Sequence, residues 1–219
     1  MRTRLAPTLR INARQAQKEA TRDKLLNAAG DLMSERDTLD FSLIEVAARA
    51  GVSPTLIQYH FGGRDGLLLA IVERGTQRAV EQLAKLEKLD APAPRKLKLH
   101  VEGLVAAYVQ APYINSLINM LIVSGDEQRA RYVSDIFVKP VADFHKMLLR
   151  QGVAEGSFRE IDPMHFYFIL AGACENFVSR RVAHFYVFGD YWKGSDVEKL
   201  YAKSVYEVVA AGLGCFDAS

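Results

Sequence analysis

The sequence predicts an all-α protein in which a long helix joins a small N-terminal helical domain to a larger one. Three observations lead to this fold class. Apolar residues recur at helical spacing along most of the 219 residues, no segment alternates like a strand, and Gly- or Pro-rich breaks fall at a few defined places. We expect residues 1–18 to form a basic arm, residues 19–75 the first domain and residues 76–219 the second.

The N-terminal stretch is strongly basic. Residues 1–24 hold seven lysines and arginines against two acidic residues, although the net charge of the whole chain is only +2. Such a stretch is either a solvated tail or an arm that neutralises phosphates, and composition leaves both open. A helix is expected from about Ala16 to Arg36. Asp37 or Asp40 must then turn the chain, because Asp tolerates left-handed backbone angles.

A capping box marks the next helix. Ser42 with Glu45 three residues later predicts a helix over residues 42–50, because each side chain can satisfy a backbone N–H of the other. Gly51 follows where a chain needs a positive φ to leave a helix and turn sharply. The expected apolar side of this helix consists of Ile44, Val46, Ala47 and Ala50.

A second short helix follows after three residues, which makes the pair a helix-turn-helix. Ser53 is expected to cap it and Pro54 to occupy its first position, where the missing N–H costs nothing. Ile57, His60 and Phe61 recur at helical spacing toward the interior. Thr55, Gln58 and Tyr59 are therefore predicted to face outward, which suits a helix that enters the major groove of DNA.

The run AARAGVSPTLIQYHFGGRDGLL, within about Thr21–Glu73, resembles the N-terminal domain of the TetR family of bacterial transcriptional regulators. The resemblance implies an N-terminal three-helix DNA-binding domain, a long helix, and a helical domain for effector binding and dimerisation. It also implies double-stranded DNA, at a palindromic operator, as a partner. The candidate DNA-binding residues are Ser42, Ser53, Pro54, Thr55, Gln58, Tyr59, His60 and Arg64.

The long helix is expected from about Arg64 to Leu89. Arg64 at its start could clamp a phosphate, since helix N-termini favour anions, or could pair with a nearby acid such as Asp65. The segment 90–94, with two prolines, ends the helix. Further helices are predicted at Arg95–Gln110, Tyr113–Ser124, Gln128–Gly152 with a kink at Pro140, Pro163–Phe188 and Asp196–Gly212.

The last two predicted helices mix small with large apolar residues. The family resemblance implies that they pair with their copies in a second subunit as a four-helix bundle, which makes the protein a homodimer. Symmetry supports this, because one reading helix contacts few bases and a rigid dimer supplies a second at a fixed spacing. The alternative is that these faces only complete an internal core.

Aromatic and polar side chains mix in the second domain, where they either fill a core or line an effector cavity. Polar groups there, Glu175 and Arg180 among them, are more numerous than a dry bundle would bury. The ligand is expected to be mostly apolar with at most one polar end. The candidate effector-binding residues are Tyr108, Asn119, Met120, Phe137, Phe144, His145, Phe168, Cys174, Asn176 and Phe177.

Other classes of function find little support. The sequence has no nucleophile elbow and no phosphate-binding loop, and its five histidines never fall at i, i+4 spacing, so we expect neither an enzyme, a metal nor a cofactor. No apolar run suits a signal peptide or a membrane helix, which favours the cytoplasm. We therefore predict a homodimeric repressor released from its operator by a small molecule; the alternatives are a DNA-binding dimer without an effector, or an activator.

Overall fold

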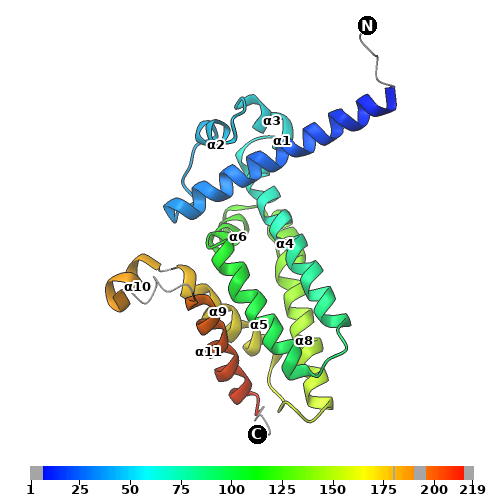
Figure 1. The fold of residues 1–219 in the computed structure, drawn as a ribbon, viewed down its shortest axis with the longest axis vertical. Coiled ribbons are helices and arrows are strands. Elements are labelled where there is room, and N and C mark those ends of the chain that lie inside the picture. The colour runs from blue at the N-terminus through cyan, green and yellow to red at the C-terminus, as the bar shows by residue number, and fades with distance from the viewer. Residues whose placement is uncertain (1–6, 180, 190–195, 215–219) are drawn as a thin grey trace. The chain divides into compact units, whose positions relative to one another are not determined.

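The computed structural model describes residues 7–179, 181–189 and 196–214, and it confirms the all-α class (Figure 1). Within these residues every regular element is a helix. The chain divides into two compact units, Met1–Val72 and Glu73–Ser219. The elements are α1 (Pro7–Arg36), α2 (Leu43–Ala50), α3 (Thr55–Phe61), α4 (Arg64–Lys88), α5 (Ala93–Gln110), α6 (Ile114–Ser124), α7 (Glu127–Val133), the π-helical turn η1 (Ser134–Val138), α8 (Lys139–Ala154), α9 (Pro163–Ser179), α10 (Arg181–Phe188) and α11 (Val197–Gly212).

The first helix is longer than predicted. α1 begins at Pro7 rather than near Ala16, so much of the expected arm is helical, and residues 1–6 lie outside the described residues. Proline is tolerated in a first helical turn, and no second proline or glycine interrupts the chain before Gly30. At its other end Asp37 adopts φ 50°, so Asp37 makes the predicted left-handed turn.

The capping box at α2 is present as predicted. The Glu45 N–H donates to the Ser42 hydroxyl over 3.2 Å, and the Ser42 N–H donates to the Glu45 carboxylate over 2.8 Å. Hydrogen bonds from Arg36 and then from Ser42 lower the pKa of Glu45 to about 2. Gly51 ends the helix at φ 68°. One expectation was wrong: Ile44 is 70% exposed, because Val46 and Ala47 alone supply the buried side of this short helix.

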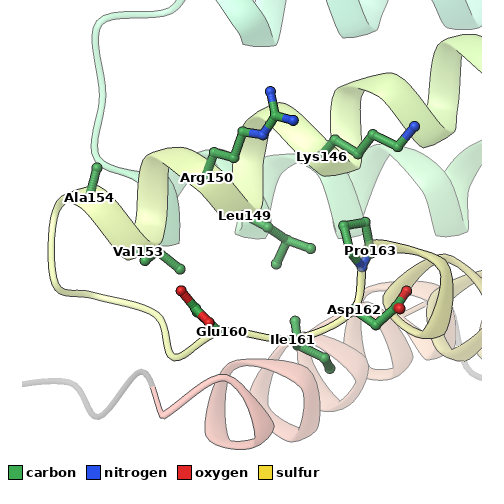
Figure 2. A pocket seen from close by; sticks show the side chains of 9 residues that line it. All are labelled: Lys146, Leu149, Arg150, Val153, Ala154, Glu160, Ile161, Asp162 and Pro163. Carbon is green, nitrogen blue, oxygen red and sulfur yellow. The ribbon is translucent and has the colours of Figure 1, made fainter.

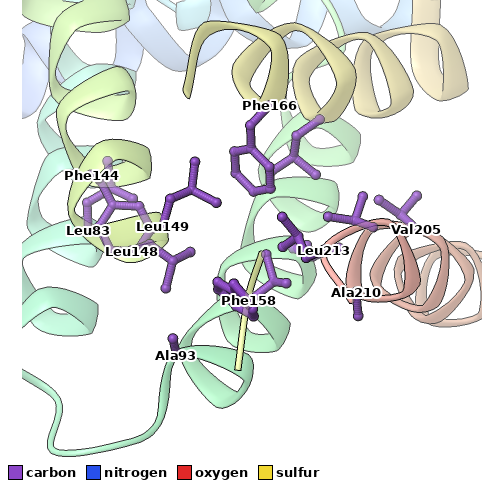
Figure 3. Close-up of a cluster of buried hydrophobic side chains, with 14 residues drawn as sticks. Leu83, Ala93, Phe144, Leu148, Leu149, Phe158, Phe166, Val205, Ala210 and Leu213 are labelled. Atoms are coloured by element: carbon purple, nitrogen blue, oxygen red, sulfur yellow. The ribbon is translucent and has the colours of Figure 1, made fainter. Parts of the chain in front are cut away.

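The core of the second unit is formed by α5, α8, α9, α11 and the C-terminal part of α4 (Figure 3). Phe158, in the loop after α8, packs directly on Gly152. A Cβ at Gly152 would lie 1.9 Å from the Phe158 ring, so only glycine allows the loop to close on the helix. The buried members of this core are Leu83, Ala93, Leu97, Val101, Phe144, Leu148, Leu149, Phe158, Phe166, Leu170, Val205, Val209, Ala210 and Leu213.

The predicted helix Gln128–Gly152 is helical throughout, but a π turn, η1, interrupts the α-helical pattern between α7 and α8. Pro140 has no N–H to donate and its ring clashes with the carbonyl four residues back. The turn before it widens instead, and the Lys139 N–H donates to Ser134, five residues earlier. The predicted helix Pro163–Phe188 is likewise two elements, α9 and α10. None of the described helices has the length and apolarity needed to cross a bilayer.

Two histidines lie in contact, edge to face, inside the second unit. His100 on α5 and His145 on α8 place their Nε2 atoms 2.8 Å apart, so one ring donates a hydrogen bond and the other accepts it. Both are buried among aromatic rings, with Phe144 at 4.8 Å from His100 and Phe166 at 4.9 Å from His145. Burial lowers the pKa of His100 to about 3, with a contribution from His145, and the pKa of His145 to about 4.

This pair predicts that acid destabilises the fold. In the unfolded chain each histidine takes up a proton near pH 6.5, whereas the folded pair stays neutral to about pH 4. The free energy of unfolding should therefore fall between pH 7.5 and 5, by about 2 kcal/mol for each histidine. Urea unfolding followed by circular dichroism across this range measures the slope. His145→Gln should flatten it, whereas His165→Gln, at an exposed position on α9, should not. An unchanged slope in His145→Gln contradicts this account.

Candidate nucleic-acid interface and ligand site

The short helix α3 presents a polar and aromatic face. Thr55, Gln58 and Tyr59 are exposed, Tyr59 by 67%, while Ile57 is fully buried. The structure therefore places the outward face as the sequence predicted. Gly62, at φ 72°, ends the helix, and its N–H donates to the Gln58 carbonyl. The face is thus only two turns long, with its N-terminal end open to solvent.

At that N-terminal end, Ser53 and Thr55 form a small polar edge. α3 begins at Thr55, with Pro54 immediately before it. The Ser53 hydroxyl lies 2.8 Å from the Thr55 hydroxyl and accepts a long hydrogen bond, 3.4 Å, from the Thr55 N–H. Two expectations were therefore wrong: Pro54 stands at the cap position rather than in the first turn, and no side chain caps the helix. The Ser53 and Thr55 hydroxyls remain at the surface.

Two other predicted residues have structural partners. The Ser42 hydroxyl accepts from the Glu45 N–H and donates to the Glu45 carboxylate, so its hydrogen-bonding capacity is used in the capping box. His60 is half-buried, with its ring edge-on to Tyr59 at 5.1 Å. Burial, and then the charges of Lys18 and Arg22, lower its pKa, so His60 is neutral at pH 7 and supports Tyr59.

Lys18 and Arg22 on α1 belong to the predicted basic stretch but were not among the candidate DNA-binding residues. The Lys18 Nζ lies 5.4 Å from the centre of the Tyr59 ring, and the Arg22 guanidinium lies 5.4 Å from that of Phe61. Arg14, one turn earlier, continues the same side of α1 and is exposed. We call Arg14, Lys18 and Arg22 the α1 basic stripe. Their i, i+4 spacing was the available signal, but only the fold shows that they lie beside α3.

Arg64 makes contacts within the protein that the sequence did not predict, and the phosphate contact expected of it stays a prediction. Its guanidinium donates to the backbone carbonyl of Phe41 and, over 2.7 Å, to that of Leu39. It also lies 4.4 Å from the centre of the buried Phe41 ring. Arg64 therefore fastens the start of α4 to the loop between α1 and α2. Two of its guanidinium nitrogens thus donate to protein carbonyls.

In the second unit, a hollow of about 420 Å³ opens between α5, α6, η1 and α9. We call it the α6–α9 hollow. Four predicted residues line it, namely Tyr108, Asn119, Phe137 and Phe168. The other lining residues are Asn115, Ser116, Ile118, Ile122, Val138, Tyr167, Ala171, Gly172 and Glu175.

The six other predicted residues lie elsewhere. Phe144 and His145 are buried in the core between α5, α8 and α9. Cys174 and Phe177 are buried in a second cluster, where burial raises the pKa of the Cys174 thiol to about 12 and Phe177 stacks on Tyr201. Asn176 is exposed, and Met120 is half-buried outside the lining. Helical spacing alone could not tell which of these residues line the hollow and which are buried in the core, because adjacent turns of α9 face different neighbours.

Hydroxyl, amide and carboxylate groups line one side of the α6–α9 hollow. The Asn115 amide donates to the Tyr108 hydroxyl over 2.8 Å. Burial raises the pKa of Tyr108 and of Tyr167, and the charge of Glu175 raises both further. Both phenols therefore stay protonated at neutral pH and can act as hydrogen-bond donors, while Glu175 supplies negative charge.

A second hollow, of about 660 Å³, lies between α8 and the loop that leads into α9 (Figure 2). Lys146 and Arg150 border it from α8, and Glu160 and Asp162 border it from the loop. Its charges are of both signs and no aromatic ring lines it, so it lacks the features expected of an effector site. We call it the α8 hollow. In the part of the chain that the structure describes, no group of three His, Cys, Asp or Glu side chains could hold a metal ion.

Two family models match the chain. The model "Bacterial regulatory proteins, tetR family" matches residues 25–71, and "Tetracyclin repressor-like, C-terminal domain" matches residues 90–217. Among curated proteins, the HTH-type transcriptional regulator BetI of Brucella anthropi is 23% identical over an alignment of 167 residues, which covers 72% of this chain and 86% of that protein.

Solved structures share the fold at low sequence identity. A bacterial regulatory protein in the tetR family from Rhodococcus RHA1 has a TM-score of 0.68 and 18% identity, covering 90% of this chain and 98% of that one. The transcriptional regulator FadR from Bacillus subtilis, in complex with stearoyl-CoA, has a TM-score of 0.65 and 18% identity, covering 86% and 97%. The likeness therefore extends over both units of the chain.

The contacts of Arg64 predict a change in stability. Arg64→Ala should lower the free energy of unfolding by about 2 kcal/mol, because two charge-assisted hydrogen bonds to buried carbonyls are lost. Arg64→Lys should recover part of this lost free energy, because an ammonium group can donate to the carbonyls but lacks the two-pronged geometry of a guanidinium. Arg78→Ala, at an exposed position of the same helix, is the matched control and should change little. Equal stability of Arg64→Ala and Arg78→Ala in urea titrations would refute the structural role.

Proposed function

Because the chain belongs to the tetR family of bacterial regulatory proteins, we propose that it is a homodimeric repressor that a small, mostly apolar effector releases from a palindromic operator. One observation carries the DNA-binding part of this proposal: the exposed face of α3 lies beside the α1 basic stripe. Polar and aromatic side chains that can read bases are thereby flanked by cations that can hold phosphates.

Base reading is assigned to the outward face of α3. A short helix can enter the major groove with its first residues nearest the base edges. There the Gln58 amide can pair in a bidentate manner with adenine, and Thr55 and Tyr59 can contact neighbouring bases. Tyr59 is oriented by His60 behind it and by Lys18 above its ring.

Phosphate binding is assigned to the α1 basic stripe rather than to Arg64. Arg14, Lys18 and Arg22 stand one helical turn apart, roughly 6 Å each, on a helix rather than on a flexible arm. Such a row can follow one strand beside the groove that α3 occupies. Contacts of this kind orient the protein on DNA but do not depend on sequence.

Dimerisation is assigned to α9 and α11. Large apolar side chains of both helices are exposed in the single chain, including Ile169 at 54%, Leu200 at 55% and Val208 at 73%. Exposed apolar groups that are this numerous on adjoining helices favour a protein interface. A second copy of the chain is the partner that a palindromic operator requires.

Release by an effector is assigned to the α6–α9 hollow. Phe137 and Val138, in the π turn η1, form part of its wall. Five residues before Phe137, the Tyr132 hydroxyl donates to the Glu73 carboxylate of α4 over 2.7 Å. A ligand that moves η1 therefore acts on α7 and on α4, whose N-terminal end Arg64 fastens beside α2. By linkage, an effector that weakens DNA binding must itself bind the DNA complex more weakly by the same factor.

The DNA contacts predict two kinds of mutant. Lys18→Ala should weaken binding to all duplexes equally and reduce the salt dependence by about one unit, because one phosphate contact is lost. Gln58→Ala should cost about 1–3 kcal/mol only on the preferred operator. Selection from random duplexes supplies that operator, and salt titrations of binding supply the slopes.

Lys24→Ala is the control for Lys18→Ala, because six residues place Lys24 on a different side of α1. It should leave both affinity and salt dependence unchanged. If the purified chain enriches no sequence from the random pool, the proposed function fails. If Lys18→Ala and Gln58→Ala have the same effect on every duplex, the division between phosphate and base contacts fails.

The proposed dimer interface predicts that one substitution on α11 makes the protein monomeric. Val208→Glu should weaken self-association at least tenfold, because a carboxylate would be buried in an apolar interface. Val123→Glu, on α6 and 76% exposed in the single chain, is the control and should remain dimeric. Light scattering after size exclusion distinguishes the two. A dimer that persists in Val208→Glu places the interface on another surface.

A further inference from the structure

We propose that the α6–α9 hollow selects an organic cation with an apolar body, such as an alkylammonium, over neutral or anionic ligands of the same size. This inference rests on the proposed function, in which the hollow is the effector site, and it adds the charge of the ligand. Three features of the lining support it: the sign of its charge, its aromatic rings and its neutral polar groups.

The charge of the lining is negative. Glu175 is a lining residue, and among the residues that the structure describes no lysine, arginine or histidine lines the hollow. An anionic ligand would therefore meet a like charge without a cation to offset it. A cationic ligand would gain a carboxylate partner at the mouth of the hollow, where Glu175 is exposed.

The carboxylate of Glu175 acts within the hollow and not only at its edge. After burial, its charge contributes to the raised pKa of both Tyr108 and Tyr167, which also line the hollow. Behind Tyr167 lies His145, with ring centres 5.9 Å apart. Burial lowers the pKa of His145, so this histidine is neutral at pH 7 and supplies no compensating positive charge.

Aromatic rings supply the second feature. Tyr108, Phe137, Tyr167 and Phe168 all line the hollow, and the rings of Tyr167 and Phe168 meet edge to face at 5.6 Å. The faces of aromatic rings attract ammonium groups, and the attraction grows as water is removed. Ile118, Ile122 and Val138 add aliphatic surface for the apolar body of the ligand.

The remaining polar groups are neutral, and the size is that of a ligand site. Asn115, Ser116 and Asn119 offer amide and hydroxyl groups that carry no charge. A volume of about 420 Å³ lies within the range of roughly 300–1,000 Å³ for small-molecule pockets. The α8 hollow differs, because Lys146 and Arg150 of α8 border it together with Glu160 and Asp162 of the loop, and its charges therefore favour neither sign (Figure 2).

Three probes with one common tail test the inference on the full-length protein: octyltrimethylammonium, octanol and octanoate. Calorimetry at low ionic strength should show the cation bound about tenfold more tightly than octanol, with octanoate weaker still. Glu175→Gln should lower the affinity for octyltrimethylammonium by about fivefold to tenfold and leave that for octanol unchanged. Glu160→Gln, which removes a carboxylate of the α8 hollow, is the matched control and should bind all three probes as the parent does.

Gly172→Phe locates the binding site. A Cβ at Gly172 meets nothing within 4 Å, so a phenylalanine there can fill the mouth of the hollow without disturbing α9. It should abolish binding of octyltrimethylammonium while circular dichroism and DNA binding are retained.

The outcomes separate this inference from the proposed function. Octanoate or octanol bound as tightly as the cation, and blocked by Gly172→Phe, overturns the cation preference and leaves the hollow as a ligand site. A cation that binds equally to the parent, Glu175→Gln and Gly172→Phe binds elsewhere and also overturns the inference. If octyltrimethylammonium does not bind at all, the inference is likewise overturned, while operator binding by the same preparation continues to support the DNA-binding function.

Discussion

The fastening of Arg64 to the carbonyls of Leu39 and Phe41 is the constraint on which the DNA-binding unit depends. The buried Phe41 also holds the loop between α1 and α2, and a guanidinium is suited to join two carbonyls in one plane. Because Arg64 is the first residue of α4, the same contact joins the start of α4 to the segment that leads into α2. The capping box at Ser42 then orients α2, and the left-handed Gly51 directs the chain into α3.

The second unit combines a dry core with a polar hollow beside it. The core closes where Phe158 packs on Gly152 and where His100 and His145 satisfy one another away from water. The hollow forms where Pro140 prevents a regular helix, because the widened turn η1 brings Phe137 and Val138 into its wall. π turns are frequent at functional sites.

The DNA-binding unit and the α6–α9 hollow carry charges of opposite sign. Cations lie on α1 beside α3, where they can meet a polyanion, whereas the hollow of the second unit carries a carboxylate and neutral groups. A ligand of opposite charge to DNA is thereby directed to a different unit from the one that binds DNA. The division follows from which helices the charged side chains occupy and needs no net charge on the chain beyond +2.

The sequence by itself determined the elements whose signals are local. The Ser42–Glu45 box, the left-handed glycines and the outward face of α3 depend on residues within one or two turns of each other, so they could be predicted. Only the tertiary structure decided the partners of long side chains. Arg64 meets carbonyls more than twenty residues away, His145 meets His100, and Lys18 meets Tyr59. Helical periodicity states which side of a helix a residue occupies but not which distant segment packs against it, and that packing separates the lining of the hollow from the core.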